Sequence, residues 1–412
     1  MSVSDSAAVV AEQLLSPQHL KVVSCVQLQS LWSNYGEICS LDVEQLSAPP
    51  STANRSRPLI LKLIQPPAGA RQDDEGYMRK IISYQVERYF YDKLAPKLAL
   101  HVSLAACVIS SGPETKGSEL THSQPPAIAL VLEDLRERFR DSVARRGNLN
   151  KLQSSAAIRW LAKFHHYSQQ LITNLDRTQL LLAPLEEAQK PNFDLFHCGN
   201  RLWLNGGYTY LATRRSEYAQ LVSDCKSEWS EALCQDALGT KYSIAELAAE
   251  YLTPCGRPSE SLIHGDVKSE NLFATEDASD VAFFDFQYVG LGYGVCDLAK
   301  LFTCSVPAEQ LGLENAPDQS IPMLPGEKSL LHEYLEVRCS QDGMSLDAQW
   351  DEFSRQWETA LVDWCRFQAS WGFWGNTEWL SARVRYIIKD IGWQNWLLEE
   401  ISMRSHRESS TS

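Results

Sequence analysis

The stretch HGDVKSEN, residues 264–271, places an imidazole, a carboxylate, an ammonium and an amide close together in the chain. A carboxylate such as that of Asp266 can accept or orient the proton of a reacting hydroxyl. Asn271, five residues later, can supply a side-chain oxygen to a metal ion across a tight loop. Lys268 either contacts a transferred phosphate or lies on the surface, and His264 is expected to fix the loop backbone rather than move protons. Because this pattern also occurs by chance, its meaning depends on the rest of the chain.

Three further ionisable residues stand within or beside apolar runs. Lys62 lies inside LILKLI, residues 59–64, where an ammonium is unusual unless a phosphate or carboxylate offsets its burial. Glu87, on the helix expected next, could be that partner, although a solvent-facing lysine and a solvated glutamate remain alternatives. Asp285 ends the apolar run VAFF and would hold a second metal ligand rigidly. With Asp266, these residues match what phosphoryl transfer from ATP requires, which is positioning and the neutralisation of phosphate charge.

The first third of the chain, which must position Lys62 and Glu87, has a mainly β pattern. Alternating apolar residues indicate strands, and apolar residues at helical spacing indicate one helix, which Pro96 is expected to close. The expected elements are a strand, turn and strand over 26–43, a strand at 59–64, a helix at 75–94, and strands at 101–110 and 127–133. Residues 1–134 are therefore predicted to form one lobe, with a five-stranded sheet and one prominent helix.

After residue 134 the pattern is mainly helical. Residues 154–171 form a strongly amphipathic segment with serines at its start, and residues 172–260 are mixed. Short strands are expected to flank the stretch 264–271, and the chain is helical from about residue 327. Eight of the twelve tryptophans lie at or beyond Trp350, at spacings that favour a helical core and leave an aromatic wall for a cation as the alternative. Residues 135–412 are predicted to form the second lobe.

The composition excludes several classes of function. The chain has 412 residues and a formal charge of −14, without a Lys/Arg-rich run, which argues against nucleic acid or a membrane as a main partner. The eleven cysteines are scattered without a CxxC pair, so reduced thiols are expected rather than a disulfide framework or a zinc site. The first residues lack a basic start followed by an apolar run, and no apolar stretch approaches the ~20 residues of a membrane helix. We predict a cytoplasmic protein.

Several motifs resemble one branch of the protein-kinase-like superfamily: the aminoglycoside phosphotransferases, choline kinases and ecdysteroid-kinase-like proteins. The resemblance covers roughly residues 26–375 and rests on HGDVKSENLF, FFDFQYVGLGYGVCDLAKLF, LAKFHH, SYQVERYFYDKL and LVDWCRFQASW. It implies an α+β, bilobal fold with a small mainly-β lobe and a large mainly-α lobe. It also implies that ATP binds with its adenine against backbone groups from Glu133 to Leu135, and that residues 172–260 help to build the acceptor site.

The chain departs from protein kinases in ways that favour a smaller acceptor. Gly265 replaces the arginine of the protein-kinase loop, and DFQ replaces D-F-G. Only eleven residues separate Asp285 from Asp297, and no A-P-E follows, which leaves no room for a protein-substrate segment. GLGYG, residues 290–294, is interpreted as a turn that leads to Asp297 rather than as a phosphate cradle.

The loop between the first two strands also departs from the kinase pattern, because it has no G-x-G-x-x-G. If this loop covers the phosphates, the backbone amides of Ser33, Asn34 and Gly36 must do so. Asp297 is expected to brace the stretch 264–271 through hydrogen bonds, with a simple helix cap as the alternative.

The sequence thus predicts an ATP- and Mg²⁺-dependent phosphotransferase that acts on the hydroxyl of a small molecule, with its oligomeric state left open. Lys62, held by Glu87, would orient the α- and β-phosphates, Asn271 and Asp285 would bind Mg²⁺, and Asp266 would orient the acceptor hydroxyl. A non-catalytic nucleotide-binding module of the same fold is the alternative, and a protein kinase is the third interpretation.

Overall fold

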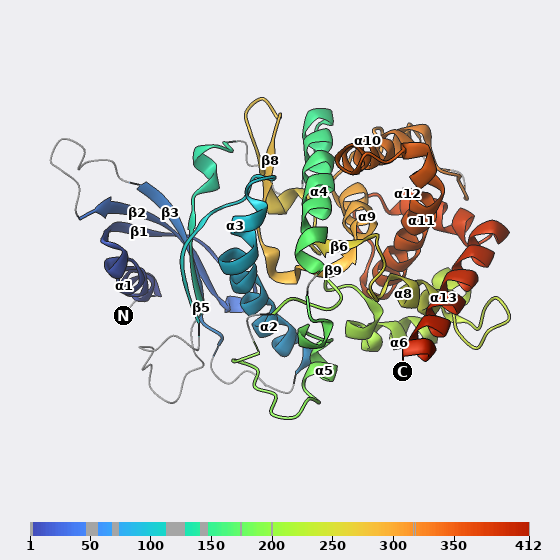
Figure 1. Ribbon diagram of the computed structural model, residues 1–412, viewed down its shortest axis with the longest axis horizontal. Coiled ribbons are helices and arrows are strands. Elements are labelled where there is room, and N and C mark those ends of the chain that lie inside the picture. Colours follow the sequence, from blue (N-terminus) through green and yellow to red (C-terminus); the bar gives the residue numbers. More distant parts are fainter. Residues whose placement is uncertain are drawn as a thin grey trace. The chain divides into compact units, whose positions relative to one another are not determined.

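The computed structural model describes two compact units, each assembled from separate segments of the chain (Figure 1). Unit 1 comprises Met1–Arg140, Gln179–Leu202 and Phe284–Gln287, and unit 2 comprises Asp141–Thr178, Trp203–Phe283 and Tyr288–Ser412. Residues 3–46, 57–67, 74–112, 128–140, 147–173, 175–198, 201–315, 317 and 319–411 are described. The short segment that contains Asp285 therefore belongs to the same unit as Lys62.

Unit 1 is built on an antiparallel five-stranded sheet with the order β1-β2-β3-β5-β4. Alternate residues of β2 are buried because successive side chains of a strand point to opposite faces of the sheet. Part of the polar loop expected between the second and third strands lies outside the described residues. The strands are β1 (Leu20–Ser30), β2 (Gly36–Gln45), β3 (Arg57–Ile64), β4 (Cys107–Ser111) and β5 (Ile128–Glu133).

Helices cover the two faces of this sheet. Helix α1 (Val3–Leu15) packs Ala7, Ala11 and Leu15 against one face, which includes Leu61 and Leu63 of β3. Lys62 lies between those two leucines and so points to the opposite face, where it meets α2 (Glu75–Tyr89). The alternation along β3 thus separates an apolar face from the face that carries the ammonium.

The predicted helix over 75–94 is longer than expected, and Pro96 does not close it. After α2 the chain continues through a π-helical turn, Phe90–Leu94, into the short helix α3 (Ala95–Leu98). Pro96 is in the first turn of α3, where the missing N–H of a proline removes no helical hydrogen bond. The predicted strand over 101–110 is shorter than expected and covers only Cys107–Ser111.

Unit 2 is mainly helical. Its longest early helix, α4 (Lys151–Ile172), starts three residues before the predicted segment because Asn150 and Gln153 form a capping box. Two small antiparallel sheets pair β6 (Glu260–Ile263) with β9 (Gly290–Tyr293) and β7 (Leu272–Ala274) with β8 (Val281–Phe283). The other helices of four residues or more outside α1–α3 are α5 (Pro184–Glu187, in unit 1), α6 (Arg215–Ser223), α7 (Glu228–Cys234), α8 (Ile244–Leu252), α9 (Gly294–Cys304), α10 (Pro325–Asp342), α11 (Leu346–Trp371), α12 (Thr377–Ile387) and α13 (Ile391–Thr411).

The first four residues of GLGYG form strand β9 and the last begins α9, which corrects the predicted turn. Its glycines allow close packing rather than a reversal of the chain. A Cβ at Gly290 would come within 2.5 Å of the Trp203 carbonyl oxygen, and one at Gly292 within 2.7 Å of the Ile263 side chain. A glycine-rich run is typical of a turn, but here small residues let two strands and a neighbouring segment approach closely.

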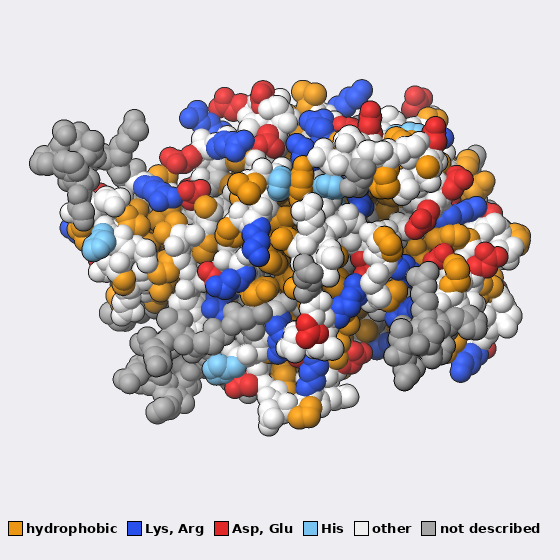
Figure 2. Space-filling view, viewed as in Figure 1, with side chains coloured by type: hydrophobic (Ala, Val, Ile, Leu, Met, Phe, Trp, Pro, Cys, Tyr) orange, Lys and Arg blue, Asp and Glu red, His pale blue; other side chains and the backbone are white. Residues whose placement is uncertain are grey.

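Four of the eight tryptophans at or beyond Trp350 are buried core residues. Trp357, Trp379 and Trp393 are fully buried, whereas Trp371 at the end of α11 is 55% exposed. On the face drawn in Figure 2, basic side chains are scattered among acidic and apolar ones rather than gathered in one patch. No helix within the described ranges is long and apolar enough to cross a membrane, and all eleven cysteines are free thiols. The predicted fold class is confirmed, with a unit built on an antiparallel sheet and a larger, mainly-α unit, but unit 1 has a second long helix, α1, besides the expected α2.

Candidate active site

In unit 1 the ammonium of Lys62 is held between two carboxylates. Its Nζ lies 2.6 Å from Glu87 Oε2 and 2.7 Å from Asp285 Oδ1. Lys62 is 6% exposed and Glu87 is 1% exposed, so the ion pair is largely removed from water. This answers the question raised by a lysine inside an apolar strand, because its partner is the helix glutamate proposed from the sequence.

Burial and charge compete at this ion pair. Burial disfavours the charged form of Lys62, but the carboxylates of Asp285 and Glu87 outweigh it and hold the pKa of Lys62 above its ordinary value. Burial raises the pKa of Glu87, to about 7, even though Lys62 acts in the opposite direction. Lys62 therefore stays protonated and positively charged at this site.

The DFQ motif is held in place by its phenylalanine. The ring of Phe286 stacks on that of Phe90 with a centroid separation of 4.0 Å and meets Tyr91 edge-on at 5.6 Å. Both partners belong to the π-helical turn after α2. Asp285 itself has φ 67°, which is uncommon for a residue other than glycine. The aromatic packing of Phe286 thus maintains a strained backbone that directs Asp285 to Lys62.

The β1–β2 turn, residues 31–36, has an unusual backbone. Ser33 and Asn34 both have φ 58°, and Gly36 has φ 139°. A Cβ at Gly36 would lie 1.9 Å from the Leu63 carbonyl oxygen, so only glycine fits there. The proposed phosphate-covering role of these residues stays a prediction.

The segment expected to meet adenine follows β5. The amide of Glu133 donates to the carbonyl of Ala106, and the carbonyl of Leu135 accepts from Arg138 and Phe139 in a short helical turn. These backbone groups are thus already paired within the chain. An adenine-binding role for Glu133 and Leu135 stays a prediction.

In unit 2 the loop 264–271 follows β6 directly and folds around Asp266. Oδ2 of Asp266 accepts hydrogen bonds from Lys268 Nζ at 2.8 Å and from Asn271 Nδ2 at 3.0 Å. Asn271 Nδ2 also donates to the Asp266 carbonyl at 2.8 Å. Because both bonds use the amide nitrogen, Oδ1 is the Asn271 atom suited to a metal ligand. An amide oxygen is one of the hard donors that Mg²⁺ prefers, and the metal-binding role of Asn271 stays a prediction.

Asp297 braces this loop from α9. It accepts the backbone N–H groups of His264 at 2.7 Å and Gly265 at 2.9 Å, and it is fully buried. The ring of His264 turns back on the loop, where Nδ1 lies 3.2 Å from the Asp266 nitrogen. Asp297 thus binds the loop backbone, and His264 is buried with its Nδ1 against a backbone amide.

Gly265 is required by its surroundings. It has φ 85°, and a Cβ there would lie 2.5 Å from the carbonyl oxygen of Tyr288 and 2.7 Å from the nitrogen of Gly207. An arginine, which protein kinases have at this position, would not fit this loop. The substitution noted in the sequence therefore has a local steric cause.

Sequence reasoning missed two buried residues that support the loop. Lys300, three residues after Asp297 on α9, donates to the Gly265 carbonyl at 2.9 Å and is 4% exposed. His165 of α4 lies 3.1 Å from Asp297 through Nε2 and 2.8 Å from the hydroxyl of Tyr334 through Nδ1. The motifs DLAKLF and LAKFHH carry these residues, but nothing in the sequence shows that their partners are a carbonyl and a distant aspartate.

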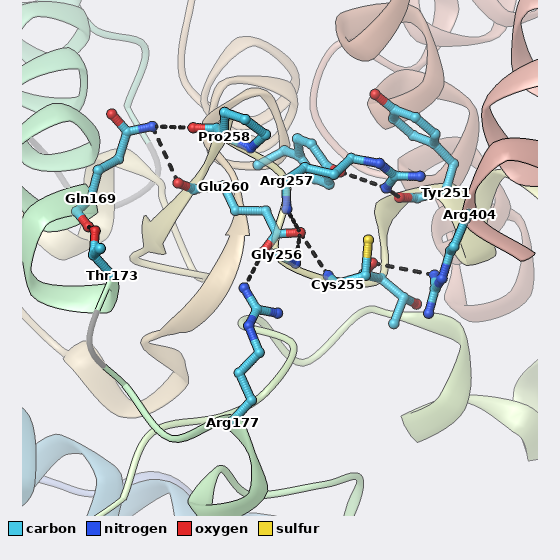
Figure 3. Close-up of polar contacts among 12 residues, drawn as sticks. Gln169, Thr173, Arg177, Tyr251, Cys255, Gly256, Arg257, Pro258, Glu260 and Arg404 are labelled. Atoms are coloured by element: carbon cyan, nitrogen blue, oxygen red, sulfur yellow. Dashed lines mark hydrogen bonds and ion pairs between the residues drawn. The ribbon is translucent and has the colours of Figure 1, made fainter. Parts of the chain in front are cut away.

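Figure 3 shows how the start of β6 is fixed just ahead of the loop. The buried carboxylate of Glu260 accepts the backbone N–H groups of Cys255 at 2.6 Å, Gly256 at 2.9 Å and Arg257 at 3.0 Å. Arg177 Nη2 adds a bond of 2.6 Å. The strand that leads into the loop 264–271 is therefore anchored at its first residue by a carboxylate that has both a cation and three amide donors.

A family model for the ecdysteroid kinase-like family matches residues 37–315, which is more than half of the chain. The chain belongs to the ecdysteroid kinase-like family. This confirms the branch of the superfamily to which the motifs pointed, and the match includes Lys62, Glu87, Asp266 and Asp297. No curated protein matches significantly.

Solved structures of small-molecule kinases align along nearly the whole chain of this ecdysteroid kinase-like protein, at low similarity. The amicoumacin kinase hAmiN, in complex with AMP-PNP and Ca²⁺, is 10% identical with a TM-score of 0.41, over 97% of this chain and 92% of that chain. Choline kinase from Cryptosporidium parvum Iowa II is 13% identical with a TM-score of 0.39, over 96% and 91%. Macrolide 2′-phosphotransferase MphH from Brachybacterium faecium is 12% identical with a TM-score of 0.41, over 92% and 97%. The family assignment rests on the sequence match alone.

Proposed function

We propose that the protein is an ATP- and Mg²⁺-dependent phosphotransferase that transfers the γ-phosphoryl group to a hydroxyl of a small molecule. The observation that carries the proposal is the ammonium of Lys62, held by Glu87 and Asp285 within one unit of the fold. Burying a lysine with two carboxylate partners costs desolvation free energy. Binding of the ATP phosphates is a function that accounts for such a lysine. Membership of a kinase-like family supports the same reaction.

The nucleotide side would work through charge and position. Lys62 would bind the α- and β-phosphates as a point charge, and Glu87 would keep its ammonium in place. Asp285 and Asn271 would hold Mg²⁺, which when bound neutralises phosphate charge. Within the described residues, no cluster of three or more His, Cys, Asp or Glu side chains could hold a metal ion. The proposed site therefore has only two protein ligands, and the phosphates of the bound nucleotide would supply others.

The acceptor side would depend on Asp266. Its carboxylate would accept a hydrogen bond from the acceptor hydroxyl and take the proton as the new bond to phosphorus forms. Asn271 and Lys268 bind Oδ2 and so fix the rotamer of Asp266. Asp297 and Lys300 hold the loop backbone on either side of Gly265. The loop backbone and the Asp266 side chain are thus already held in place before substrates would bind.

Aromatic side chains near Asp266 bear on the kind of acceptor. Burial first and the Asp266 carboxylate next raise the pKa of Tyr208 well above its ordinary value. The guanidinium of Arg214 lies 5.6 Å from the ring centroid of Tyr208, 5.5 Å from that of Phe367 and 4.9 Å from that of Trp371. The chain's own cation thus occupies the faces that a quaternary ammonium would need. This favours an acceptor alcohol without a quaternary ammonium group.

The test is a screen of hydroxylated metabolites for acceptor-dependent ADP release from Mg-ATP. The wild-type protein should turn over at least one acceptor, and Asp266→Asn and Asp285→Asn should each lower kcat by about a thousandfold or more while the protein stays folded. Asp351→Asn, at an exposed position on α11, is the matched control and should leave the rate unchanged. Full activity in both site variants would contradict the assignment. Mg-ATP binding without turnover of any acceptor would favour the nucleotide-binding module instead.

A further inference from the structure

A second lysine reaches the β1–β2 turn from the same helix that carries Glu87. Lys80 of α2 donates a hydrogen bond of 3.0 Å from Nζ to Ser33 Oγ. Its ammonium also lies 4.5 Å from the ring centroid of Tyr35 and 5.3 Å from that of Trp32. All of these residues belong to unit 1. The turn that lacks the glycine pattern is therefore accompanied by a cation that the sequence motifs did not reveal.

The charge of Lys80 is poorly compensated. Among the described residues, no carboxylate makes an ion pair with it, and Asp74, the acid that acts on it most, caps the start of α2 by accepting from the Tyr77 amide. Burial lowers the pKa of Lys80 from its ordinary value, and Asp74 only partly offsets this. Two aromatic faces and one hydroxyl are weak substitutes for a carboxylate. A partly buried ammonium in this state is suited to receive an anion.

Lys80 and Lys62 lie on the same side of unit 1. Lys80 is seven residues before Glu87, two helical turns away and on the same face of α2. The rings between the two lysines are continuous: Lys62 lies 5.5 Å from the ring centroid of Tyr84, which is 6.4 Å from that of Tyr35. Lys80 and Glu87, the partner of Lys62, are roughly 10 Å apart along the axis of α2. One pair of tyrosines thus links the two cations. They would meet different phosphates of one bound nucleotide.

We infer that Lys80 is a second phosphate-binding cation, which contacts the terminal phosphates of ATP where the β1–β2 turn offers no glycine-rich cradle. The inference rests on the proposed function and adds a residue to its nucleotide site. In the free protein Ser33, Trp32 and Tyr35 hold the ammonium at the turn. On binding, the phosphate oxygens replace the Ser33 hydroxyl as its acceptor, and charge pairing replaces the weaker contacts. In a chain with a net charge of −14, such local cations are what an anionic nucleotide requires.

The test compares nucleotides that differ in phosphate number. Wild type, Lys80→Met, Lys80→Arg and Lys93→Met are titrated with adenosine, ADP and ATP in the presence of Mg²⁺ by isothermal calorimetry. Lys80→Met should weaken ATP binding by about tenfold and leave adenosine binding unchanged, because a hydrogen bond to a charged group is lost only where phosphate is present. Lys80→Arg keeps the charge and should stay within about threefold of wild type. Lys93 is exposed beside Asp92 on the turn after α2, so its variant is the control for losing a surface cation.

The outcomes separate the inference from the proposed function. Equal ATP affinity in Lys80→Met and wild type would overturn the role of Lys80 while the proposed function stands. An equal loss for adenosine and ATP would also overturn it, because the lysine would then only support the turn. Absence of ATP binding to the wild-type protein would overturn both. Thermal unfolding of Lys80→Met and Lys80→Arg, measured in parallel, shows that each variant is folded before its affinity is compared.

Discussion

Lys268 and Asn271 bind the same oxygen of Asp266, at 2.8 Å and 3.0 Å from Oδ2. The lysine is 32% exposed at its side chain and the aspartate only 11%, so the pair lies at the edge of the protein interior. Two donors on one oxygen fix the carboxylate rotamer and leave Oδ1 outside both of these hydrogen bonds. Lys268 therefore pairs with the candidate base in this structure, and its contact with a transferred phosphate stays a prediction.

Replacing Lys268 with methionine should lower kcat by about tenfold to a hundredfold, because the carboxylate loses one of the two donors that orient it. The KM for ATP should change far less, since the proposed function assigns the α- and β-phosphates to Lys62 rather than to Lys268. Steady-state kinetics with the acceptor found in the metabolite screen measures both. Lys226→Met, at an exposed position in the same unit, should behave as wild type. A Lys268→Met protein with unchanged kcat would refute the positioning role.

Replacing Gly265 with alanine should abolish activity and destabilise the protein. Alanine at φ 85° is strained, and its Cβ would lie 2.5 Å from the Tyr288 carbonyl oxygen. Gly343 is the matched control, since it has φ 65° and no atom within 4 Å of an added Cβ. Gly343→Ala should cost about 1–2 kcal/mol of unfolding free energy from backbone strain alone. Urea unfolding should show a larger loss for Gly265→Ala, and equal losses would mean that the close approach is easily relieved.

The outline of both units followed from sequence because strand alternation and helical spacing are local signals. The pairing of Lys62 with Glu87 was also predictable, since a lysine inside an apolar strand requires an opposite charge and the next helix supplied one. The β9 strand was misread because glycine has two uses, and only the neighbouring chain shows that Gly292 makes room for Ile263. Local patterns do not report such packing.

The supporting residues of the loop escaped prediction for a different reason. Lys300 binds a carbonyl and Glu260 binds three backbone amides, and backbone groups have no identity in a sequence. His165 meets Asp297 across 132 positions of the chain. Interactions of this kind depend on tertiary packing, so the sequence pattern did not single out these residues.

Protonation of His165 should make the protein less stable in mild acid. Burial lowers the pKa of His165 from 6.5, despite the opposing effect of Asp297. The unfolded chain therefore binds a proton that the folded chain resists, and stability falls as pH drops below about 6.5 by up to ~1.4 kcal/mol per unit. Glu87 acts in the opposite sense, because its raised pKa favours the folded state as pH falls toward 4.5.

The contribution of His165 is isolated by comparing variants. His165→Gln should be less stable than wild type at pH 7.5, where the bonds to Asp297 and Tyr334 are complete, and the difference should shrink at pH 5.5. Urea unfolding at both pH values measures this. His197→Gln, at an exposed histidine beside Asp194, is the control and should follow wild type more closely than His165→Gln does. Parallel losses in wild type and His165→Gln would show that the titration of His165 does not contribute.

Removing Arg214 should create affinity for a quaternary ammonium. Arg214 is 5% exposed and lies within 6 Å of the ring centroids of Tyr208, Phe367 and Trp371, so alanine would free aromatic faces that now hold a guanidinium. A cation over such rings gains about 0.5–2 kcal/mol, which predicts weak binding of tetramethylammonium to Arg214→Ala, with a Kd of about 30 mM at the upper end of that gain, and none to wild type over the same range. Tryptophan fluorescence measures it, because the Trp371 ring should respond. Arg215→Ala, at a side chain 62% exposed, is the neighbouring control. Tetramethylammonium binding of equal strength in wild type and Arg214→Ala would show that Arg214 does not occupy the aromatic faces, and would restore choline-like amines as candidate acceptors.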